Sequence, residues 1–166
     1  MPKLKTLEDF LIEELKDLYS AEKQLTKALP KMVKAASADD LRDAFQNHLE
    51  ETENQIARLD KISKIIGKPL SGKKCKAMAG LVEEGKEIIE EDMEETLRDV
   101  ALIAAAQKVE HYEIASYGCA RTYAKLLEMT DVEELLQETL DEEGNANETL
   151  TGISENLNIE ALQEAV

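Results

Sequence analysis

Apolar residues recur every three to four positions along most of this sequence, which is the spacing of one face of an α-helix. The chain favours the strong helix formers Ala, Leu, Glu and Lys, and no stretch of it sustains the alternation typical of a strand. The sequence therefore predicts an all-α protein. We expect four long helices, at about residues 7–36, 38–66, 86–127 and 132–157. We also expect two short helices, at about residues 77–85 and 159–165.

Capping residues and connections indicate how these helices are joined. Thr6, Ser37 and Thr130 each precede an acidic residue by three positions, a pattern typical of helix starts. Tight turns join the first two helices and the last two, whereas a long connection rich in Gly, Pro and Lys follows residue 66. Pro30 should kink or break the first long helix. The chain is thus predicted to form one domain, an antiparallel four-helix bundle of two helical hairpins with a long crossover connection.

Polar residues interrupt the apolar stripe of each long helix near its middle. The interrupting residues are Glu22 in the first helix, His48 and Glu51 in the second, Glu110 and Glu113 in the third, and Glu143 in the fourth. Tyr19, three positions before Glu22, is a candidate donor of a hydrogen bond to that carboxylate, whereas Tyr117 is interpreted as a packing residue.

The spacing from each tight turn predicts which of these residues meet in space. In an antiparallel hairpin, residues equally distant from the turn lie at the same height. Glu22 lies 15 residues before Ser37 and Glu51 lies 14 after it. Glu113 lies 17 residues before Thr130 and Glu143 lies 13 after it, a mismatch of about 6 Å along the helix axis. The sequence therefore predicts a layer of these four glutamates, with Glu110 and His48 one turn away.

A layer of carboxylates inside an apolar core needs positive charge, because unpaired buried charge is very costly. Lysine and arginine are almost absent from these stripes near the layer. Two divalent metal ions per chain would neutralise the carboxylates, and oxygen ligands with an imidazole suit iron or manganese better than zinc. The alternative is a metal-free polar core in which His48 is an ordinary half-buried histidine.

Composition narrows the classes of partner. The 166-residue chain carries 36 acidic and 20 basic residues, a net charge of −16, which would repel nucleic acid and anionic membranes. Neither a secretory leader nor a membrane-spanning run is recognisable, so we expect a cytoplasmic protein. Cys75 and Cys119 stand far apart without metal-binding spacing, and two free thiols fit a reducing compartment.

Three segments of the sequence, DLYSAEKQL, HLEETENQIARL and LIAAAQKVEHYEIASYG, resemble the YciE/YciF family of bacterial stress-associated proteins. The resemblance covers nearly the whole chain. It implies a ferritin-like four-helix bundle that forms a homodimer and is related to rubrerythrins and other di-iron carboxylate proteins. By the same resemblance, Glu22 and Glu113 are the single bridging glutamates, and Glu51 and Glu143 are their partners.

Two positions differ from the usual di-iron pattern, in which Glu-x-x-His motifs supply part of the ligand set. The second helix carries His48-x-x-Glu51, which is the reverse order, and Ala146 stands three positions after Glu143. Glu110, three positions before Glu113, offers an additional carboxylate.

Two functional hypotheses follow. The first is a stress-associated protein whose two iron or manganese ions react with dioxygen or peroxide, which would make it an oxidoreductase of the rubrerythrin or ferritin type. The second is a non-catalytic dimeric stress protein that binds a partner, with a vestigial polar core. A storage cage is a third and weaker idea, which would assemble into a large particle.

Overall fold

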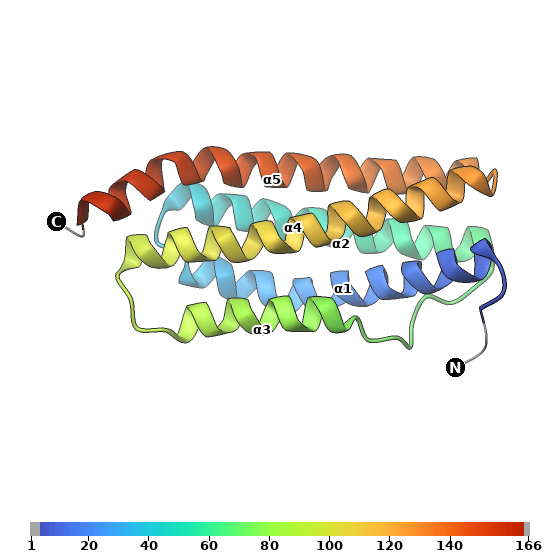
Figure 1. The fold of residues 1–166 in the computed structure, drawn as a ribbon, viewed down its shortest axis with the longest axis horizontal. Helices are drawn as coiled ribbons and strands as arrows, with labels where there is room; N and C mark the ends of the chain where they lie inside the picture. Colours follow the sequence, from blue (N-terminus) through green and yellow to red (C-terminus); the bar gives the residue numbers. More distant parts are fainter. Residues whose placement is uncertain (1–3, 165–166) are drawn as a thin grey trace.

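The computed structural model describes residues 4–164, and this part of the chain is helical without any strand, as predicted. The five helices, labelled in Figure 1, are α1 (Leu7–Ala35), α2 (Asp39–Ile66), α3 (Lys76–Glu90), α4 (Glu95–Leu126) and α5 (Thr130–Glu164). None of them combines the length and the apolar character that crossing a membrane requires.

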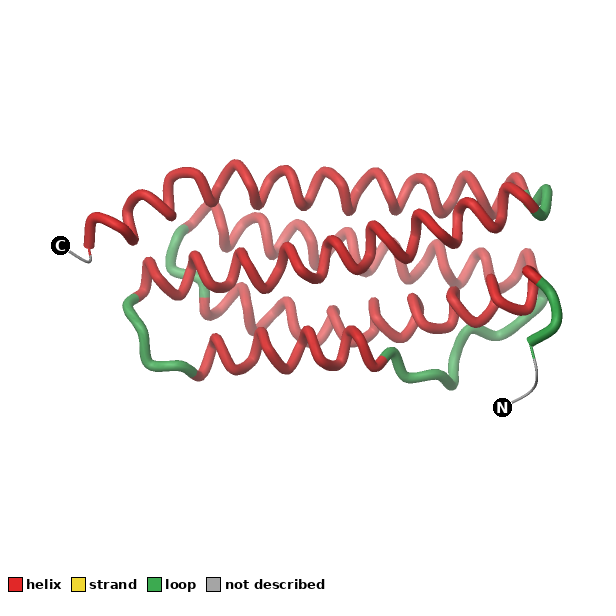
Figure 2. The backbone as a smooth tube through the Cα atoms, in the orientation of Figure 1, coloured by secondary structure: helices red, strands yellow, loops and turns green. Residues whose placement is uncertain are grey.

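The helices form two antiparallel hairpins and one outer helix. α1 pairs with α2 and α4 pairs with α5, each through a tight turn, and α2 also packs against α5 (Figure 1). The connection between the hairpins contains α3, which lies along α1 and α4 between two loops (Figure 2). The predicted four-helix bundle is thus present, and its crossover carries a helix of its own.

The buried core consists of two apolar clusters, one at each end of the bundle. One cluster contains residues such as Leu29, Phe45 and Leu102, and the other contains residues such as Leu15 and Leu59. On α2, α4 and α5 the polar residues that interrupt the stripes lie between the two clusters in sequence, and on α1 Glu22 lies beside Ala21, where the two clusters meet. Burial of the apolar clusters stabilises the bundle and holds the polar layer at its centre.

The break between α3 and α4 lies later than the sequence pattern predicts. α3 continues to Glu90, well beyond the expected end at residue 85, and α4 begins at Glu95 instead of near residue 86. The guanidinium of Arg98 donates hydrogen bonds to the carbonyls of Glu91 and Met93, at 3.3 and 3.1 Å. These bonds close the turn between α3 and α4. This backbone contact leaves no periodic signal in the sequence.

The other helix ends confirm some sequence predictions and correct others. Thr6 caps α1 in a full capping box with Asp9, as predicted. A kink or a break was expected at Pro30, and α1 continues through this residue, so the break is not present. α5 runs to Glu164 without interruption, so the prediction of a separate short helix at 159–165 is wrong for the part that the structure describes. Asn158, the candidate cap of that short helix, lies inside α5 instead, and no Pro follows it.

Ser37 does not cap α2. The N-cap position is Ala38, whose side chain makes no capping bond. The backbone N–H groups of Ser37 and Ala38 instead donate to the carboxylate of Asp99 on α4, at 2.9 and 2.7 Å. The turn between α1 and α2 is therefore held by a side chain from the other hairpin.

Candidate metal centre

Five of the six residues proposed from the sequence as metal ligands are buried at the middle of the bundle. They come from all four bundle helices and are Glu22 on α1, His48 on α2, Glu110 and Glu113 on α4, and Glu143 on α5. Their exposed fractions are 6% for His48 and 2% or less for the four glutamates. The sixth residue, Glu51, lies at the edge of the site with 39% of its side chain exposed.

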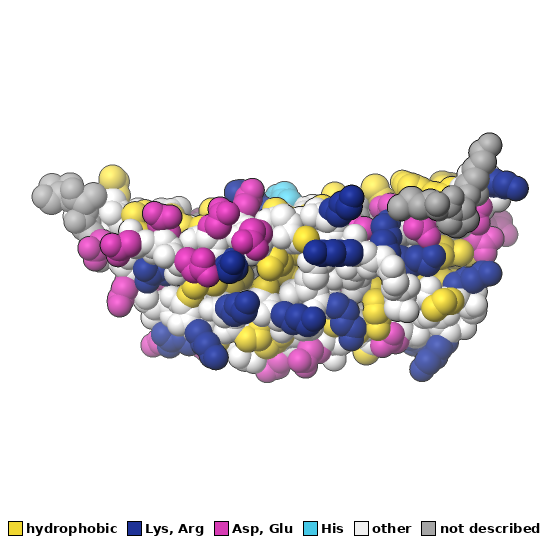
Figure 3. Space-filling model, turned by 90° about the horizontal axis from the view of Figure 1, so that it is seen from below, with side chains coloured by type: hydrophobic (Ala, Val, Ile, Leu, Met, Phe, Trp, Pro, Cys, Tyr) yellow, Lys and Arg dark blue, Asp and Glu magenta, His cyan; other side chains and the backbone are white. Residues whose placement is uncertain are grey.

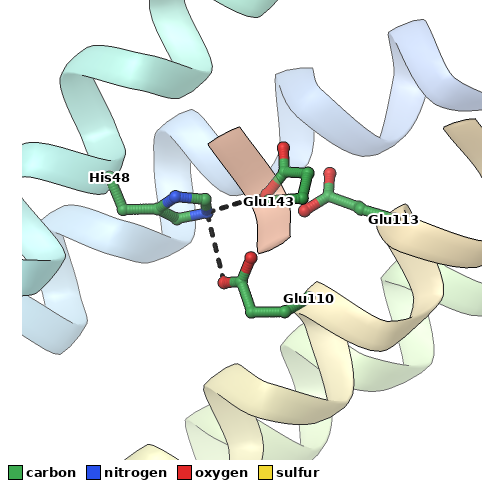
Figure 4. A group of neighbouring side chains, drawn as sticks. All are labelled: His48, Glu110, Glu113 and Glu143. Atoms are coloured by element: carbon green, nitrogen blue, oxygen red, sulfur yellow. Dashed lines mark ion pairs between the residues drawn. The ribbon is translucent and has the colours of Figure 1, made fainter. Parts of the chain in front are cut away.

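Four of these side chains form a compact group of donor atoms. His48, Glu110, Glu113 and Glu143 each place one ligand atom within 4.8 Å of all the others (Figure 4). The Nε2 atom of His48 lies 3.3 Å from Glu110 Oε1 and 4.0 Å from Glu143 Oε2. The three carboxylates and the imidazole converge from α2, α4 and α5, and we call them the His48 cluster.

Glu22 faces this cluster from α1 and is held by a residue that the sequence interpretation assigned to packing. The hydroxyl of Tyr117, fully buried on α4, donates a hydrogen bond to Glu22 Oε1. Tyr19 lies half-buried away from this contact, with Lys23 over its ring, so it is not the donor. The spacing offered a signal, because Tyr117 follows Glu113 by one helical turn on the same face of α4.

Glu51 is placed less centrally than the sequence argument predicts. Its Oε2 atom lies 3.5 Å from His48 Nδ1, on the side of the imidazole away from Glu110. In the His48 cluster α2 contributes its histidine, whereas Glu51 is positioned to orient that ring from the solvent side.

Burial and mutual repulsion raise the pKa of every buried glutamate in the site. Burial, with the charge of Glu143 nearby, raises the pKa of Glu22 to about 8. Burial raises the pKa of Glu110 to about 7. The pKa values of Glu113 and Glu143 are raised well above the usual range, again chiefly by burial. Without added positive charge, the layer therefore holds protons at neutral pH.

His48 shows the opposite balance. Burial works against protonation of its ring, but the Glu51 carboxylate, 3.5 Å from Nδ1, and the charges of Glu143 and Glu22 outweigh burial and raise the pKa of His48. His48 is the only cationic side chain within 4.0 Å of the buried glutamates in residues 4–164. One imidazolium cannot neutralise four carboxylates.

The donor atoms of the site lack partners in the described structure. Both oxygens of Glu113, both oxygens of Glu143 and one oxygen each of Glu22 and Glu110 are buried without a hydrogen bond. Native proteins rarely leave buried polar atoms unpaired, and such atoms need an explanation. A divalent cation would satisfy charge and lone pairs together, so the residues present fit a metal site.

An indentation connects the site with the surface. A cavity of about 140 Å³ reaches His48, Glu51 and Glu110, and apolar side chains such as Leu29 and Phe45 form much of its wall. A small molecule can therefore approach the cluster from the side of α2 and α5.

Comparison with known proteins places the chain in a family. Residues 6–163 match the family described as a domain of unknown function, DUF892. Protein YciF of Escherichia coli strain K12 is 49% identical over 154 residues, which cover 92% of this chain and 93% of the relative.

Solved structures agree with that match. The crystal structure of the E. coli stress protein YciF has a TM-score of 0.90 at 49% identity, covering 93% of this chain and 98% of that one. YcfI of Rhodopseudomonas palustris has a TM-score of 0.87 at 44% identity, covering 90% and 96%. A protein of Xanthomonas campestris, only 19% identical, shares the fold with a TM-score of 0.77, covering 96% and 99%. The sequence resemblance is confirmed, and the chain belongs to the YciF family of the DUF892 domain.

Proposed function

We propose that this protein is a cytoplasmic, homodimeric stress protein with a dinuclear iron or manganese site, and that the site reacts with dioxygen or peroxide. The observation that carries the proposal is the His48 cluster, in which buried carboxylate oxygens from α4 and α5 converge with the imidazole of α2 without hydrogen-bond partners. The kinship with the E. coli stress protein YciF supports a role in stress.

The residues offer the carboxylate oxygens that a site for two ions would use. Glu113 and Glu143 have both oxygens free for metal, Glu110 and Glu22 each have one, and His48 has both nitrogens without a hydrogen bond. Zinc sites favour nitrogen and sulfur ligands, whereas iron and manganese accept mostly oxygen. Bound there, such ions would supply one-electron redox chemistry with dioxygen or peroxide.

The chain's own residues would prepare the site for that chemistry. The hydroxyl of Tyr117 fixes one oxygen of Glu22 and leaves the other to face the cluster. Glu51 lies against Nδ1 of His48, which favours a ring with Nε2 directed at Glu110 and Glu143. The apolar walls of the 140 Å³ cavity limit the water that reaches these groups.

A second candidate function has an observation of its own. His48 is the single imidazole in the cluster, and the corresponding place on α5, three residues after Glu143, is Ala146. The raised pKa values also show how the layer can remain neutral without metal, by holding protons. A non-catalytic YciF-family protein that acts by binding a partner is consistent with both features.

Elemental analysis decides between these functions. The protein should be purified without chelators and its iron, manganese and zinc measured per chain, beside the double variant Glu113→Gln plus Glu143→Gln. The matched control is Glu95→Gln plus Glu148→Gln, which makes the same charge change on exposed positions of the same helices.

We expect about two iron or manganese ions in the wild-type chain and in the control, and fewer than about 0.2 in the cluster variant. In an assay that contains ferrous ion, the metal-loaded protein should consume peroxide or dioxygen at least about tenfold faster than the cluster variant does. A protein that stays metal-free and gains no thermal stability from added Fe²⁺ or Mn²⁺ would refute the site.

A further inference from the structure

A second cavity, separate from the candidate metal centre, lies between α1, α3 and α4. Its volume is about 240 Å³, and we call it the α1–α3 groove. Its walls are mainly apolar and include Ala28 on α1, Leu81, Val82 and Ile89 on α3, and Ala105 on α4. Figure 3 shows the face of α1 and α3, where exposed apolar side chains lie among both basic and acidic ones.

The rim of the groove carries positive charge in a protein of net charge −16. Lys27 and Lys31 stand one turn apart on α1, and Lys86 stands opposite on α3. Lys86 pairs with Glu83 and Glu90 at 3.4 and 3.9 Å, whereas Lys27 and Lys31 form no ion pair within residues 4–164. Two exposed and unpaired ammonium groups beside an apolar groove match an anionic head group.

The wall of the groove also contains a glycine where the helix does not require one. Gly85 lies inside α3, it is buried, and a Cβ atom built on it meets no atom within 4 Å. Glycine weakens a helix interior relative to alanine, and such a residue usually has a packing or functional reason. No neighbour packs against Gly85 in the direction of a side chain, so its effect is to leave the groove open.

The groove reaches toward the interior of the bundle. Leu25, Met32 and Val109 line both this groove and the 140 Å³ cavity that leads to His48. The partition between the two cavities is therefore one side chain thick. The inner end of a ligand in the groove would lie against this partition, with its other end at the lysines.

We propose that the α1–α3 groove binds a medium-chain fatty acid, with its carboxylate at Lys27 and Lys31 and its chain passing over Gly85. A cavity of about 150 Å³ accommodates benzene, so about 240 Å³ suits an alkyl chain of roughly eight to ten carbons. The binding of this ligand does not depend on metal in the His48 cluster.

Calorimetric titration of the full-length protein with decanoate tests the proposal, in metal-free and metal-loaded samples. Gly85→Leu fills the groove and should abolish binding, whereas Gly80→Leu, at an exposed position of the same helix with equal space, should leave it unchanged. Gly85→Leu should unfold at the same or a higher temperature, because leucine is the better helix former.

The lysines are tested by charge removal. Lys27→Gln plus Lys31→Gln should weaken decanoate binding at least tenfold, whereas Lys23→Gln plus Lys34→Gln, on the same helix outside the groove, should change it less than twofold. Decyltrimethylammonium, which has the same chain and a cationic head, should bind at least tenfold more weakly than decanoate to the wild-type protein.

Three results would overturn the proposal. One is the absence of decanoate binding at millimolar concentration, and another is equal binding by wild type and Gly85→Leu. The third combines two measurements: sedimentation velocity shows a wild-type dimer that the Gly85→Leu substitution dissociates, and wild type does not bind decanoate. The groove would then be a contact between two copies of the chain. Loss of metal binding in the cluster variant has no bearing on these outcomes.

Discussion

At the scale of single residues, Asp99 on α4 holds the turn between α1 and α2. Its side chain is 1% exposed and accepts hydrogen bonds from the backbone of Ser37 and Ala38, at the start of α2. A carboxylate at this place also interacts favourably with the positive end of the helix dipole. One α4 side chain thus ties the second hairpin to the turn of the first.

Asp99→Asn should destabilise the protein by about 1–3 kcal/mol. The amide keeps the size of the side chain, but it loses the charge and can accept at only one of its two terminal atoms, so one buried N–H loses its partner. Chemical denaturation followed by circular dichroism measures the change, and Asp92→Asn at an exposed position of the preceding turn is the control. Equal stability of the two variants would contradict this role of Asp99.

At the scale of helices, one arginine joins the two hairpins on the side of α2 and α5. Arg58 donates to Glu142 through both terminal nitrogens, to Glu138 at 2.9 Å and to Thr139 at 3.0 Å. Its side chain is only 14% exposed, so water screens these contacts less than those of a surface pair. The planar guanidinium makes several directed bonds at once, which an ammonium cannot reproduce.

Arg58→Lys should therefore lower the free energy of unfolding by about 1–2 kcal/mol although the charge is kept. The matched control is Arg121→Lys on α4, because Arg121 forms no ion pair in the described part of the chain. Thermal melts should show a decrease of about 2–8 °C for the first variant and about 1 °C or less for the second. A control that loses as much as Arg58→Lys would rule out a specific bridge.

The helices differ in how well the sequence predicted them. The long helices of each hairpin were predictable because their apolar stripes keep one period and end at short turns. The end of α3 was not predictable, because acidic residues occupy both the last turns of α3 and the loop before α4. Local hydrogen bonds from the Arg98 side chain to two loop carbonyls close the turn there. Composition cannot separate helix from loop where both are rich in glutamate.

The sequence likewise predicted only part of the candidate site. Counting from the turns placed Glu22, Glu113 and Glu143 in one buried layer, because antiparallel helices of fixed rise bring these positions together. The count carries no information on side-chain direction within a turn. For that reason it placed Glu51 in the layer where the structure places His48, and it gave no role to Tyr117.

At the scale of the whole molecule, the buried carboxylates couple folding to both pH and metal. In the metal-free protein the pKa of Glu22 is raised to about 8 and that of Glu110 to about 7, from an ordinary value of 4.5. At a pH between 4.5 and these raised values, the folded protein therefore holds protons that the unfolded chain has lost. Stability then falls as the pH rises through this range. The raised pKa of His48 acts in the same direction, because its favourable contribution is complete below 6.5 and is lost as the pH rises through its folded-state value.

The metal-free protein should consequently melt at a temperature at least about 3 °C higher at pH 5.5 than at pH 8.5, since each unit of pKa shift corresponds to about 1.4 kcal/mol and each kcal/mol to about 2–4 °C. Glu113→Gln plus Glu143→Gln should reduce this dependence, because it removes two of the buried groups whose pKa values are raised, whereas the control Glu95→Gln plus Glu148→Gln should retain it. Fe²⁺ or Mn²⁺ should reverse the trend in the wild-type protein, stabilising it at pH 8.5 and losing its effect in acid, because metal ligands must be deprotonated. Melting curves with chelator and with metal measure all of these effects. A metal-free wild-type protein that becomes more stable from pH 5.5 to pH 8.5 would show that the buried glutamates do not hold the protons assigned to them.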